Sequence, residues 1–308
     1  MKNIVVIGGG HGLSTILKGI KDINDTNISA IVTVADDGGS TGRIRERYSI
    51  PAMGDIRTVM LALSKTDPTI HDLMNYRFAG EDDGDISGHS LGNLILTALT
   101  NMYGSFDKAI KTVSDFLKVD GKIIPSTLQS VTLSAKMEDG TIVEGEKNIP
   151  SDKQYIDSVF YVNDVKANPE AIKVIEEADL IIYGIGSLYT SILPNTIIKG
   201  IDEALKKSNA KKVYFANCMT QANETYNYDL KDHINALLKH NTPVDVAIVH
   251  NNTIPSEIVN RYLLRDSIEV INNNNCEVEV KTYDLLDFDK GLVRHNPSKI
   301  KKVVEELL

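Results

Sequence analysis

Short apolar runs that end in glycine or polar residues alternate with amphipathic stretches along most of the chain. Residues 4–7 form one such run, an amphipathic stretch follows over 13–20, and a second apolar run covers 28–35. Buried parallel strands read as continuous apolar runs, and a strand, helix and strand of this total length form one βαβ unit. The pattern predicts an α/β fold of the Rossmann-like type, a mostly parallel sheet flanked by helices.

The later part of the chain repeats this alternation of apolar runs and amphipathic stretches, with one interruption. Apolar spacing predicts helices at 53–64, 70–77, 91–102, 106–117, 196–206, 230–238 and 297–307, and apolar runs predict strands at 178–183, 212–216 and 244–250. Between these parts, two short alternating runs flank Glu138-Asp139-Gly140, which is a hairpin turn signal. We therefore expect one domain over residues 1–308, with a small antiparallel β lobe inserted at about 121–165.

Composition narrows the class of protein. The net charge is −9 and the pI is near 5.3, which argues against a nucleic-acid-binding surface. The two cysteines, Cys218 and Cys276, are too few for a disulfide framework and lack metal-site spacing, which favours a reducing compartment. The first residues lack a signal-peptide pattern, and no run reaches the ~18 apolar residues of a membrane span. We expect a cytoplasmic protein without membrane insertion.

The first candidate site lies between the first predicted strand and helix. It consists of Gly8, Gly9, Gly10, His11 and Gly12. Glycines let the backbone approach a ligand, and the helix that follows offers free N–H groups and a positive dipole end to an anion. Leu13 stands where the dinucleotide fingerprint has glycine or alanine, and the lysine of a P-loop is absent. A purely structural turn remains the alternative. If Gly10 has a negative φ, valine there would obstruct the ligand without straining the backbone.

The second predicted strand also runs into a polar, glycine-rich turn. The turn contains Asp36, Asp37, Gly38, Gly39 and Ser40. In a doubly wound sheet neighbouring strand ends open on one crevice, and an acid there can accept ribose hydroxyls or hold Mg²⁺ beside a phosphate. We expect one of the two acids to face the ligand and the other to cap the loop. The alternative interpretation is that both aspartates only cap the backbone of the loop.

Charged and polar residues near two further helix starts extend the candidate site. Arginine forks match phosphate oxygens, which makes Arg43 and Arg57 candidate ligand contacts together with Asp55. We expect Arg45 and Arg47, by contrast, to lie on a solvated helix face. In Ser87–Asn93, His89 and Asn93 are further candidates, although a single histidine at a helix start is more often structural.

Two later strand ends repeat the arrangement. Gly184, Gly186, Ser187 and Tyr189 follow one apolar strand, and Asn217, Thr220 and Gln221 follow the next. Polar groups at successive strand ends are hard to explain by packing alone. Near the end of the chain, Arg294 could close over a ligand or lie on the surface beside the last helix.

These pieces, in order, resemble a known family. They are Gly8-Gly9-Gly10-His11-Gly12, Asp36-Asp37-Gly38-Gly39-Ser40, Gly54-Asp55-Ile56-Arg57, Gly88-His89-Ser90-Leu91-Gly92-Asn93, Gly186-Ser187-Leu188-Tyr189-Thr190-Ser191 and Met219-Thr220-Gln221. Together they resemble the gluconeogenesis-factor (YvcK) branch of the CofD-like superfamily over nearly the whole chain. The sequence departs from that pattern at Ile185 and at Ala222-Asn223, where the family has prolines and a glycine, which should loosen these loops.

The resemblance implies a cytoplasmic bacterial protein that binds UDP-sugars and links central carbon metabolism to envelope synthesis and cell shape. NAD and GDP are the alternative nucleotides. The CofD branch implies a different function, in which Mg²⁺-dependent enzymes transfer a phospholactyl or phosphoenolpyruvyl group from a guanosine diphosphate carrier to a deazaflavin. On that reading Asp36, Asp37 and Asp55 are the catalytic candidates, with Mg²⁺ on Asp36 and Asp37. We also expect a homodimer and envelope-synthesis proteins as partners.

Overall fold

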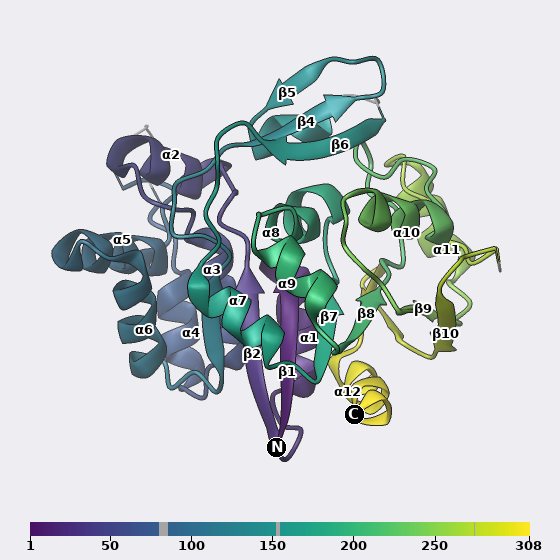
Figure 1. The fold of residues 1–308 in the computed structure, drawn as a ribbon, viewed down its shortest axis with the longest axis horizontal. Coiled ribbons are helices and arrows are strands. Elements are labelled where there is room, and N and C mark those ends of the chain that lie inside the picture. Colours follow the sequence, from purple (N-terminus) through teal and green to yellow (C-terminus); the bar gives the residue numbers. More distant parts are fainter. Residues whose placement is uncertain (80–85, 152–154, 274) are drawn as a thin grey trace.

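A parallel β-sheet forms the centre of the molecule. The structure is a computed structural model that describes residues 1–79, 86–151, 155–273 and 275–308 (Figure 1). Among these residues, seven strands pair in the order β10-β9-β8-β7-β1-β2-β3, all parallel. The strands are β1 (Lys2–Gly8), β2 (Thr26–Val32), β3 (Lys122–Pro125), β7 (Leu180–Tyr183), β8 (Lys211–Phe215), β9 (Val246–His250) and β10 (Glu279–Tyr283). The predicted α/β class with a mostly parallel sheet is confirmed.

Strand β1 shows why the sequence forms this sheet. Residues 4–8 of β1 are buried, and β1 pairs on one side with β2 and on the other with β7. Ile4 lies opposite Ile28 in β2 and Leu180 in β7. A strand paired on both edges and covered on both faces buries every side chain, which is why these runs lack polar alternation.

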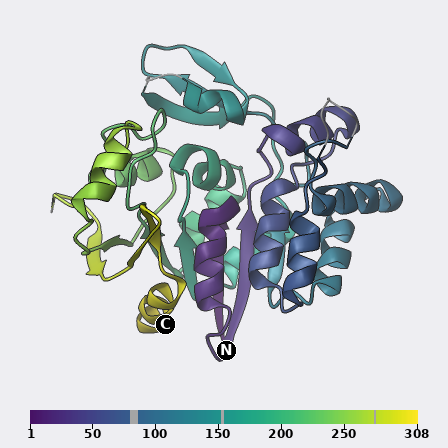
Figure 2. The ribbon, with the colours of Figure 1, turned by 180° about the vertical axis from the view of Figure 1, so that it is seen from behind.

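Helices cover both faces of the sheet. On one face lie α7, α8 and α9 (Figure 1), and on the other α1 packs between α3 and α12 (Figure 2). The helices are α1 (Gly10–Ile20), α2 (Gly39–Tyr48), α3 (Gly54–Leu63), α4 (Pro68–Asn75), α5 (Leu91–Tyr103), α6 (Phe106–Phe116), α7 (Pro169–Glu176), α8 (Leu193–Thr196), α9 (Ile201–Lys207), α10 (Leu230–Lys239), α11 (Ser256–Leu263) and α12 (Pro297–Leu307). The helix expected at 196–206 begins only at Ile201, as α9, because a turn at Gly200, whose φ is +97°, separates it from α8.

The antiparallel lobe lies beyond the carboxyl ends of the parallel strands, at the top of Figure 1. It contains β4 (Leu133–Met137), β5 (Ile142–Glu144) and β6 (Ile156–Tyr161), in the order β5-β4-β6, and a 3₁₀ helix, η1 (Glu146–Ser151). These strands begin later than the expected start of the lobe near 121. Residues 122–125 instead form β3 of the main sheet, because Ile123 and Ile124 pair in parallel with β2 and are buried there.

The last part of the chain adds elements that the sequence pattern did not predict. They are α11, the edge strand β10, and an antiparallel hairpin of β11 (Leu286–Asp289) and β12 (Leu292–His295). Arg294 and His295 lie in β12, directly before α12. Because side chains alternate along a strand, they point to opposite sides: Arg294 is exposed and His295 is buried.

Candidate functional site

The loops that follow β1, β2, β7 and β8 meet at the carboxyl edge of the sheet, below the lobe. The first loop is packed closely against its neighbours. A Cβ on Gly9 would lie 2.5 Å from Asp55 Oδ2, and one on Gly12 would collide with the carbonyl oxygen of Ile185. Gly10 has φ of +58°, and a Cβ there would lie 3.0 Å from Asp55 Oδ1. Valine at position 10 would therefore strain the backbone, contrary to the expectation of a negative φ. The turn itself requires glycine at this position.

The two acids of the second loop have different partners. Asp36 Oδ1 accepts a hydrogen bond from the Gly38 backbone N–H at 2.9 Å and so caps the loop. Asp37 Oδ1 accepts one from the Lys147 backbone N–H at 2.9 Å and thereby ties the loop to the lobe. Gly39 has φ of +46° with open space where its Cβ would be, and it begins α2.

A third carboxyl group in this region, Glu146, comes from the lobe. Loss of hydration raises the pKa of Glu146 to about 8, and the nearby Asp36 and Asp37 add to the shift. Burial likewise raises the pKa of Asp55 to about 7, Asp36 adds to it, and Arg57 opposes it. The carboxyl groups therefore hold protons near neutral pH, which is typical of clustered acids in functional sites. No local motif marks Glu146, so sequence reasoning missed it.

The predicted polar residues around α2 and α5 do come together. Ser40 Oγ lies 2.8 Å from His89 Nδ1, and Asn93 Nδ2 donates to Ser40 Oγ at 3.2 Å. All three side chains are buried. Burial lowers the pKa of His89, and the neighbouring Arg43 adds to that effect. The exposed Arg43 donates to the Ser87 carbonyl at 2.5 Å, so this network holds α2 against the start of α5.

The expectation that Arg45 lies on a solvated face is wrong. Its side chain is buried and donates to the carbonyl oxygens of Ala35, Asp36 and Val131. It thereby joins the end of the β2 loop to the chain that leads into the lobe. Arg47, in contrast, is exposed as expected.

The loops after β7 and β8 are bonded to each other. Gly186 N–H donates to Asn217 Oδ1 at 3.2 Å, and Asn217 Nδ2 donates back to the Gly186 carbonyl at 2.9 Å. Ser187 Oγ and the Tyr189 backbone N–H both donate to the buried carboxylate of Glu224. Sequence reasoning did not identify Glu224 as a site residue. Nearby, Asn223 has φ of +65°, a conformation that glycine adopts easily and asparagine tolerates.

Tyr189 is buried in this arrangement. Its hydroxyl oxygen lies 2.9 Å from that of Tyr228 and donates to the Ile156 carbonyl at 3.3 Å. The ring contributes to a cavity of about 410 Å³ between the lobe and α10, which Tyr155 and Tyr226 also line.

A smaller cavity, of about 250 Å³, opens directly at the third and fourth loops. It is lined by Ile185, Gly186, Ser187, Asn217, Cys218, Met219, Thr220, Gln221, Tyr262 and His295. Five of these are predicted site residues. Thr220 also joins the 267–268 segment, because its Oγ1 accepts from the Ile268 N–H at 3.0 Å. His295 lines the cavity in place of the predicted Arg294.

A second opening lies on the other side of the first loop. It has a volume of about 400 Å³ between α2 and the lobe, and it is lined by Asp37, Gly39, Gly42, Arg43, Arg45, Glu46, Ser130, Thr132 and Lys147. Of the predicted site residues, Asp37, Gly39 and Arg43 line this opening, and the five named above line the smaller cavity. The remaining predicted residues line neither, and His11 is exposed at the start of α1.

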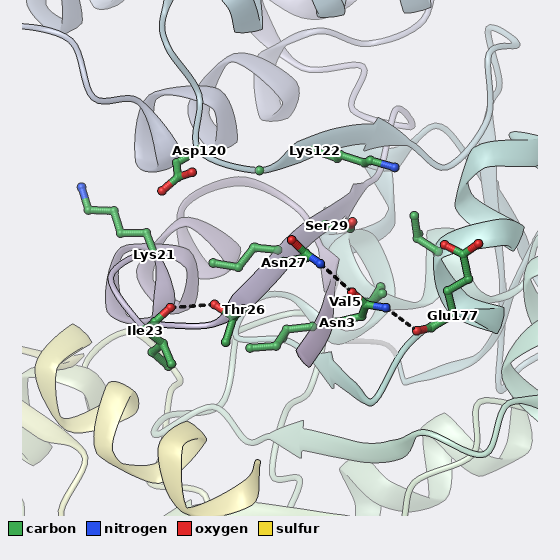
Figure 3. A pocket seen from close by; sticks show the side chains of 14 residues that line it. Asn3, Val5, Lys21, Ile23, Thr26, Asn27, Ser29, Asp120, Lys122 and Glu177 are labelled. Atoms are coloured by element: carbon green, nitrogen blue, oxygen red, sulfur yellow. Dashed lines mark hydrogen bonds between the residues drawn. The ribbon is translucent and has the colours of Figure 1, made fainter. Parts of the chain in front are cut away.

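A cavity of about 420 Å³ lies at the opposite, amino-terminal edge of the sheet (Figure 3). Several of its polar side chains already have partners. Asn27 Nδ2 donates to Asn3 Oδ1 at 3.0 Å, and Asn3 Nδ2 donates to the Glu177 carbonyl at 2.8 Å. Lys122 pairs with Glu170 at 2.7 Å. Ligands of open α/β sheets bind at the carboxyl ends of the strands, so this cavity is not the candidate site.

The carboxyl groups fit Mg²⁺ only in part. Within the ranges that the structure describes, no three His, Cys, Asp or Glu side chains are placed to hold a metal ion. Asp37 is engaged by the lobe, and Asp36 has one oxygen on Gly38 N–H. Mg²⁺ often takes only one or two carboxylates and completes its shell with water and substrate phosphates. These residues therefore suit Mg²⁺ only when it is shared with a bound phosphate.

No helix among the described residues combines the length and apolarity that crossing a bilayer requires.

Comparison with known proteins gives one consistent family. The model of "2-phospho-L-lactate transferase CofD" matches residues 4–286. A protein named gluconeogenesis factor from Listeria innocua is 45% identical over 305 residues, covering 96% of this chain and 92% of its own length. The Bacillus subtilis gluconeogenesis factor is 43% identical, covering 99% and 98%. A crystal structure of a UPF0052-family protein from Bacillus halodurans aligns with a TM-score of 0.94 at 41% identity, covering 99% of both chains.

Proposed function

Because this chain belongs to the CofD family, we propose that it binds a nucleotide ligand whose phosphates meet the glycine-led loops at the carboxyl edge of the sheet. One observation carries the proposal: the loops after β1, β2, β7 and β8 lie together at this edge, where the β2 loop lines one opening and the β7 and β8 loops line another. The amino-terminal ends of α1 and α2 lie at this edge, and the positive end of a helix dipole favours an anion. Arg43 and Lys147 border the opening beside α2 and add positive charge.

The ligand we propose is a UDP-sugar, bound without turnover by a cytoplasmic regulatory protein. Relatives over the full length of the chain carry the name gluconeogenesis factor. A protein that senses a nucleotide sugar can report the supply of envelope precursors, which would connect carbon metabolism to envelope synthesis and cell shape. Action through envelope-synthesis proteins, and a homodimer, belong to the same proposal.

Binding is tested by thermal shift and calorimetric titration with UDP-glucose, GDP, NAD and free glucose. UDP-glucose at about 100 times its Kd should add roughly 2.7 kcal/mol to the free energy of unfolding. Free glucose should add nothing, because the loops offer N–H groups for phosphates and not a sugar-binding cradle. Equal stabilisation by glucose and UDP-glucose would contradict the proposal, and a preference for GDP or NAD would change the nucleotide.

The name of the matching family model and the clustered acids favour one alternative, a Mg²⁺-dependent transferase. Mg²⁺ bound with a phosphate would neutralise charge that develops during the transfer of a phospholactyl group to a deazaflavin. In that case Asp36 would orient the ion and Asp55 would hold or release a proton. Release of GMP from a phospholactyl-guanosine donor, lost in Asp36→Asn, would establish the transferase. Absence of turnover with intact UDP-sugar binding would support the regulatory protein.

A further inference from the structure

The 410 Å³ cavity between the lobe and α10 differs in its lining from the two openings at the carboxyl edge of the sheet. Its walls include the tyrosines Tyr155, Tyr189, Tyr226 and Tyr228, and of its lining residues only Tyr189 was predicted as a site residue. Small-molecule sites commonly have volumes of about 300–1,000 Å³. The cavity is therefore large enough to hold a small organic ligand.

The two inner tyrosines are held in place by their neighbours. The hydroxyl oxygens of Tyr189 and Tyr228 lie 2.9 Å apart, and their rings meet edge to face with centroids 6.4 Å apart. Tyr228 also packs edge-on against His233, at 5.5 Å between centroids. The fold thus fixes this aromatic wall in the absence of ligand.

The two outer tyrosines remain accessible. Tyr155 is 38% exposed and Tyr226 is partly buried, and their ring centroids lie 6.3 Å apart with the planes at 54°. Their backbones are fixed, because the Glu138 N–H donates to the Tyr155 carbonyl at 3.0 Å and the Tyr228 N–H donates to the Thr225 carbonyl at 3.1 Å, closing a turn around Tyr226.

The charged residues of the lining are mainly acidic. They are Glu138, Asp157, Asp232 and Lys239, and Lys239 Nζ pairs with Asp157 Oδ1 at 2.5 Å. Burial raises the pKa of Tyr228, and the charges of Asp232 and Glu138 add to the rise, so both carboxylates act on the aromatic wall. This excess of negative charge disfavours phosphate and favours a cation.

The rings of the cavity carry no cation of the chain. Among the described residues, a cationic side chain stacks on a tyrosine at Tyr48 and at Tyr103, and not at Tyr155 or Tyr226. The same part of the chain places no group of three His, Cys, Asp or Glu side chains to hold a metal ion. Aromatic rings attract organic cations, above all quaternary ammonium groups.

We propose that this cavity is a second ligand site, which binds an organic cation of the alkylammonium class. The cation lies against the rings of Tyr155 and Tyr226, and the carboxylates of Glu138 and Asp232 balance its charge. The site is separate from the proposed nucleotide site, whose glycine-led loops and basic residues select the opposite charge.

The test compares choline with dimethylbutanol, in which a carbon atom replaces the charged nitrogen. Ligand-detected NMR titrations measure both affinities at low and high salt. We expect choline to bind about tenfold more tightly than the alcohol, because the two differ only in charge. Salt should weaken the binding of choline and leave that of the alcohol unchanged.

Variants of the cavity locate the binding. Tyr155→Leu and Tyr226→Leu should each weaken choline binding about two- to fivefold, whereas Tyr226→Phe, which keeps the ring, should not. Glu138→Gln, at an exposed position, should weaken choline binding most at low salt. Tyr103→Leu is the matched control, since Tyr103 is also partly buried but lies on α5, outside the cavity.

Equal affinity for choline and the alcohol, or no binding of choline, would overturn the inference. So would choline binding that Tyr155→Leu, Tyr226→Leu and Glu138→Gln leave unchanged, because the cation would then be bound elsewhere. Binding of glucose in place of choline, lost in Tyr226→Leu, would assign the cavity to a neutral sugar and overturn it as well. The leucine variants should bind UDP-glucose like the parent, so failure of this proposal is distinguishable from failure of nucleotide binding.

Discussion

At the scale of single residues, the glycines of the first loop are explained by their neighbours in the fold. The ligand that the sequence suggested is not needed to account for them. Gly9 and Gly10 lie against Asp55, and Gly12 lies against the Ile185 carbonyl. Close approach of two loops requires glycine as strictly as contact with a phosphate does. A glycine motif therefore predicts the position of the site better than it predicts which residues contact the ligand.

Gly12→Ala should destabilise the protein by at least the 1–3 kcal/mol typical of an overpacked core, because its Cβ would collide with the Ile185 carbonyl. Chemical denaturation measures the change. Gly8→Ala is the matched control, since a Cβ there meets only Leu13 at an ordinary 3.7 Å. Equal stability of the two variants would show that the loops separate readily.

Glu146→Gln should change how stability depends on pH. The pKa of Glu146 is raised from 4.5 to about 8, so its contribution to stability is complete below about pH 4.5 and is lost as the pH rises through 8. Glutamine mimics the protonated form at every pH. The variant should therefore gain stability relative to the parent between pH 5.5 and 8.5, measured by urea unfolding with EDTA present.

Glu144→Gln, on an exposed position of β5, is the control for this experiment. Its difference from the parent should not grow with pH. A constant difference for Glu146→Gln as well would show that the lobe carboxyl group is solvated.

Some site residues were predictable from the sequence and others were not. Ser40, His89 and Asn93 each follow a glycine in a motif, and the structure brings them together. Glu146 and Glu224 carry no such local signal. They reach the site because the lobe and the loop after β8 fold back over it. A local sequence pattern does not show which distant segments come together in the fold.

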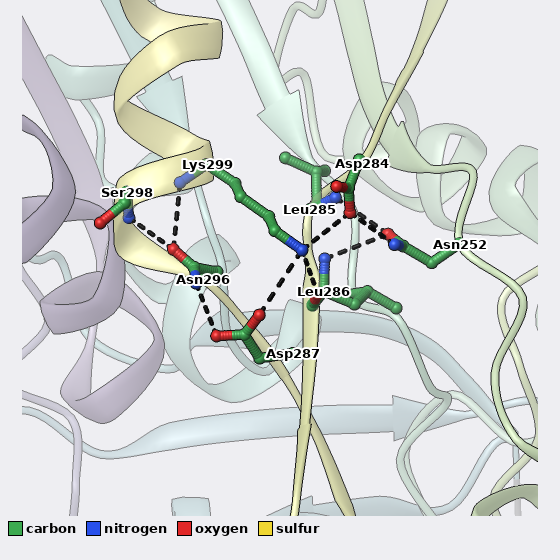
Figure 4. Close-up of polar contacts among 8 residues, drawn as sticks. All are labelled: Asn252, Asp284, Leu285, Leu286, Asp287, Asn296, Ser298 and Lys299. Atoms are coloured by element: carbon green, nitrogen blue, oxygen red, sulfur yellow. Dashed lines mark hydrogen bonds and ion pairs between the residues drawn. The ribbon is translucent and has the colours of Figure 1, made fainter.

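At the scale of elements, Asn252 anchors the start of the hairpin β11–β12 (Figure 4). Asn252 alone accepts from two backbone N–H groups at its start. Asn252→Ala should leave both without that partner and cost about 1–3 kcal/mol. It should also speed amide exchange of Leu285 and Leu286 before the rest of the protein opens. Exchange at the parental rate would contradict this role. Ser298→Ala, which leaves the backbone bond at that position intact, is the control.

Apolar and amphipathic patterns predicted α1, α12 and the four-residue strand β7, whereas β3 and β12 were missed. The helices α1 and α12 each have 11 residues with a clear amphipathic pattern. The four residues of β3 and of β12 give no such pattern. Short apolar runs fit a parallel edge strand, a hairpin or an irregular segment equally well, and only pairing with a distant strand decides among them.

At the scale of the whole molecule, the hydrogen bonds of Arg45 help to hold the lobe over the sheet. Arg45→Lys keeps the charge but cannot donate to three carbonyls with one planar group. We expect a loss of about 1.5–3 kcal/mol and faster proteolysis near residues 126–132. Arg47→Lys, on the exposed side of α2, should cost less than about 0.5 kcal/mol. Proteolysis at the parental rate would mean that other contacts suffice to hold the lobe.

The pairing of β1 between β2 and β7 also has a consequence during protein synthesis. The partner of Ile4 on one side is Ile28, but on the other it is Leu180. The ribosome adds about 5–20 residues per second, so one apolar edge of β1 is without its partner for roughly 10–30 s. Nascent chains stalled before residue 180 should therefore be protease-sensitive and recruit chaperones, and chains stalled well beyond β8 should resist. The first strand of the sheet to be made therefore gains its second neighbour only after more than half of the chain has been synthesised.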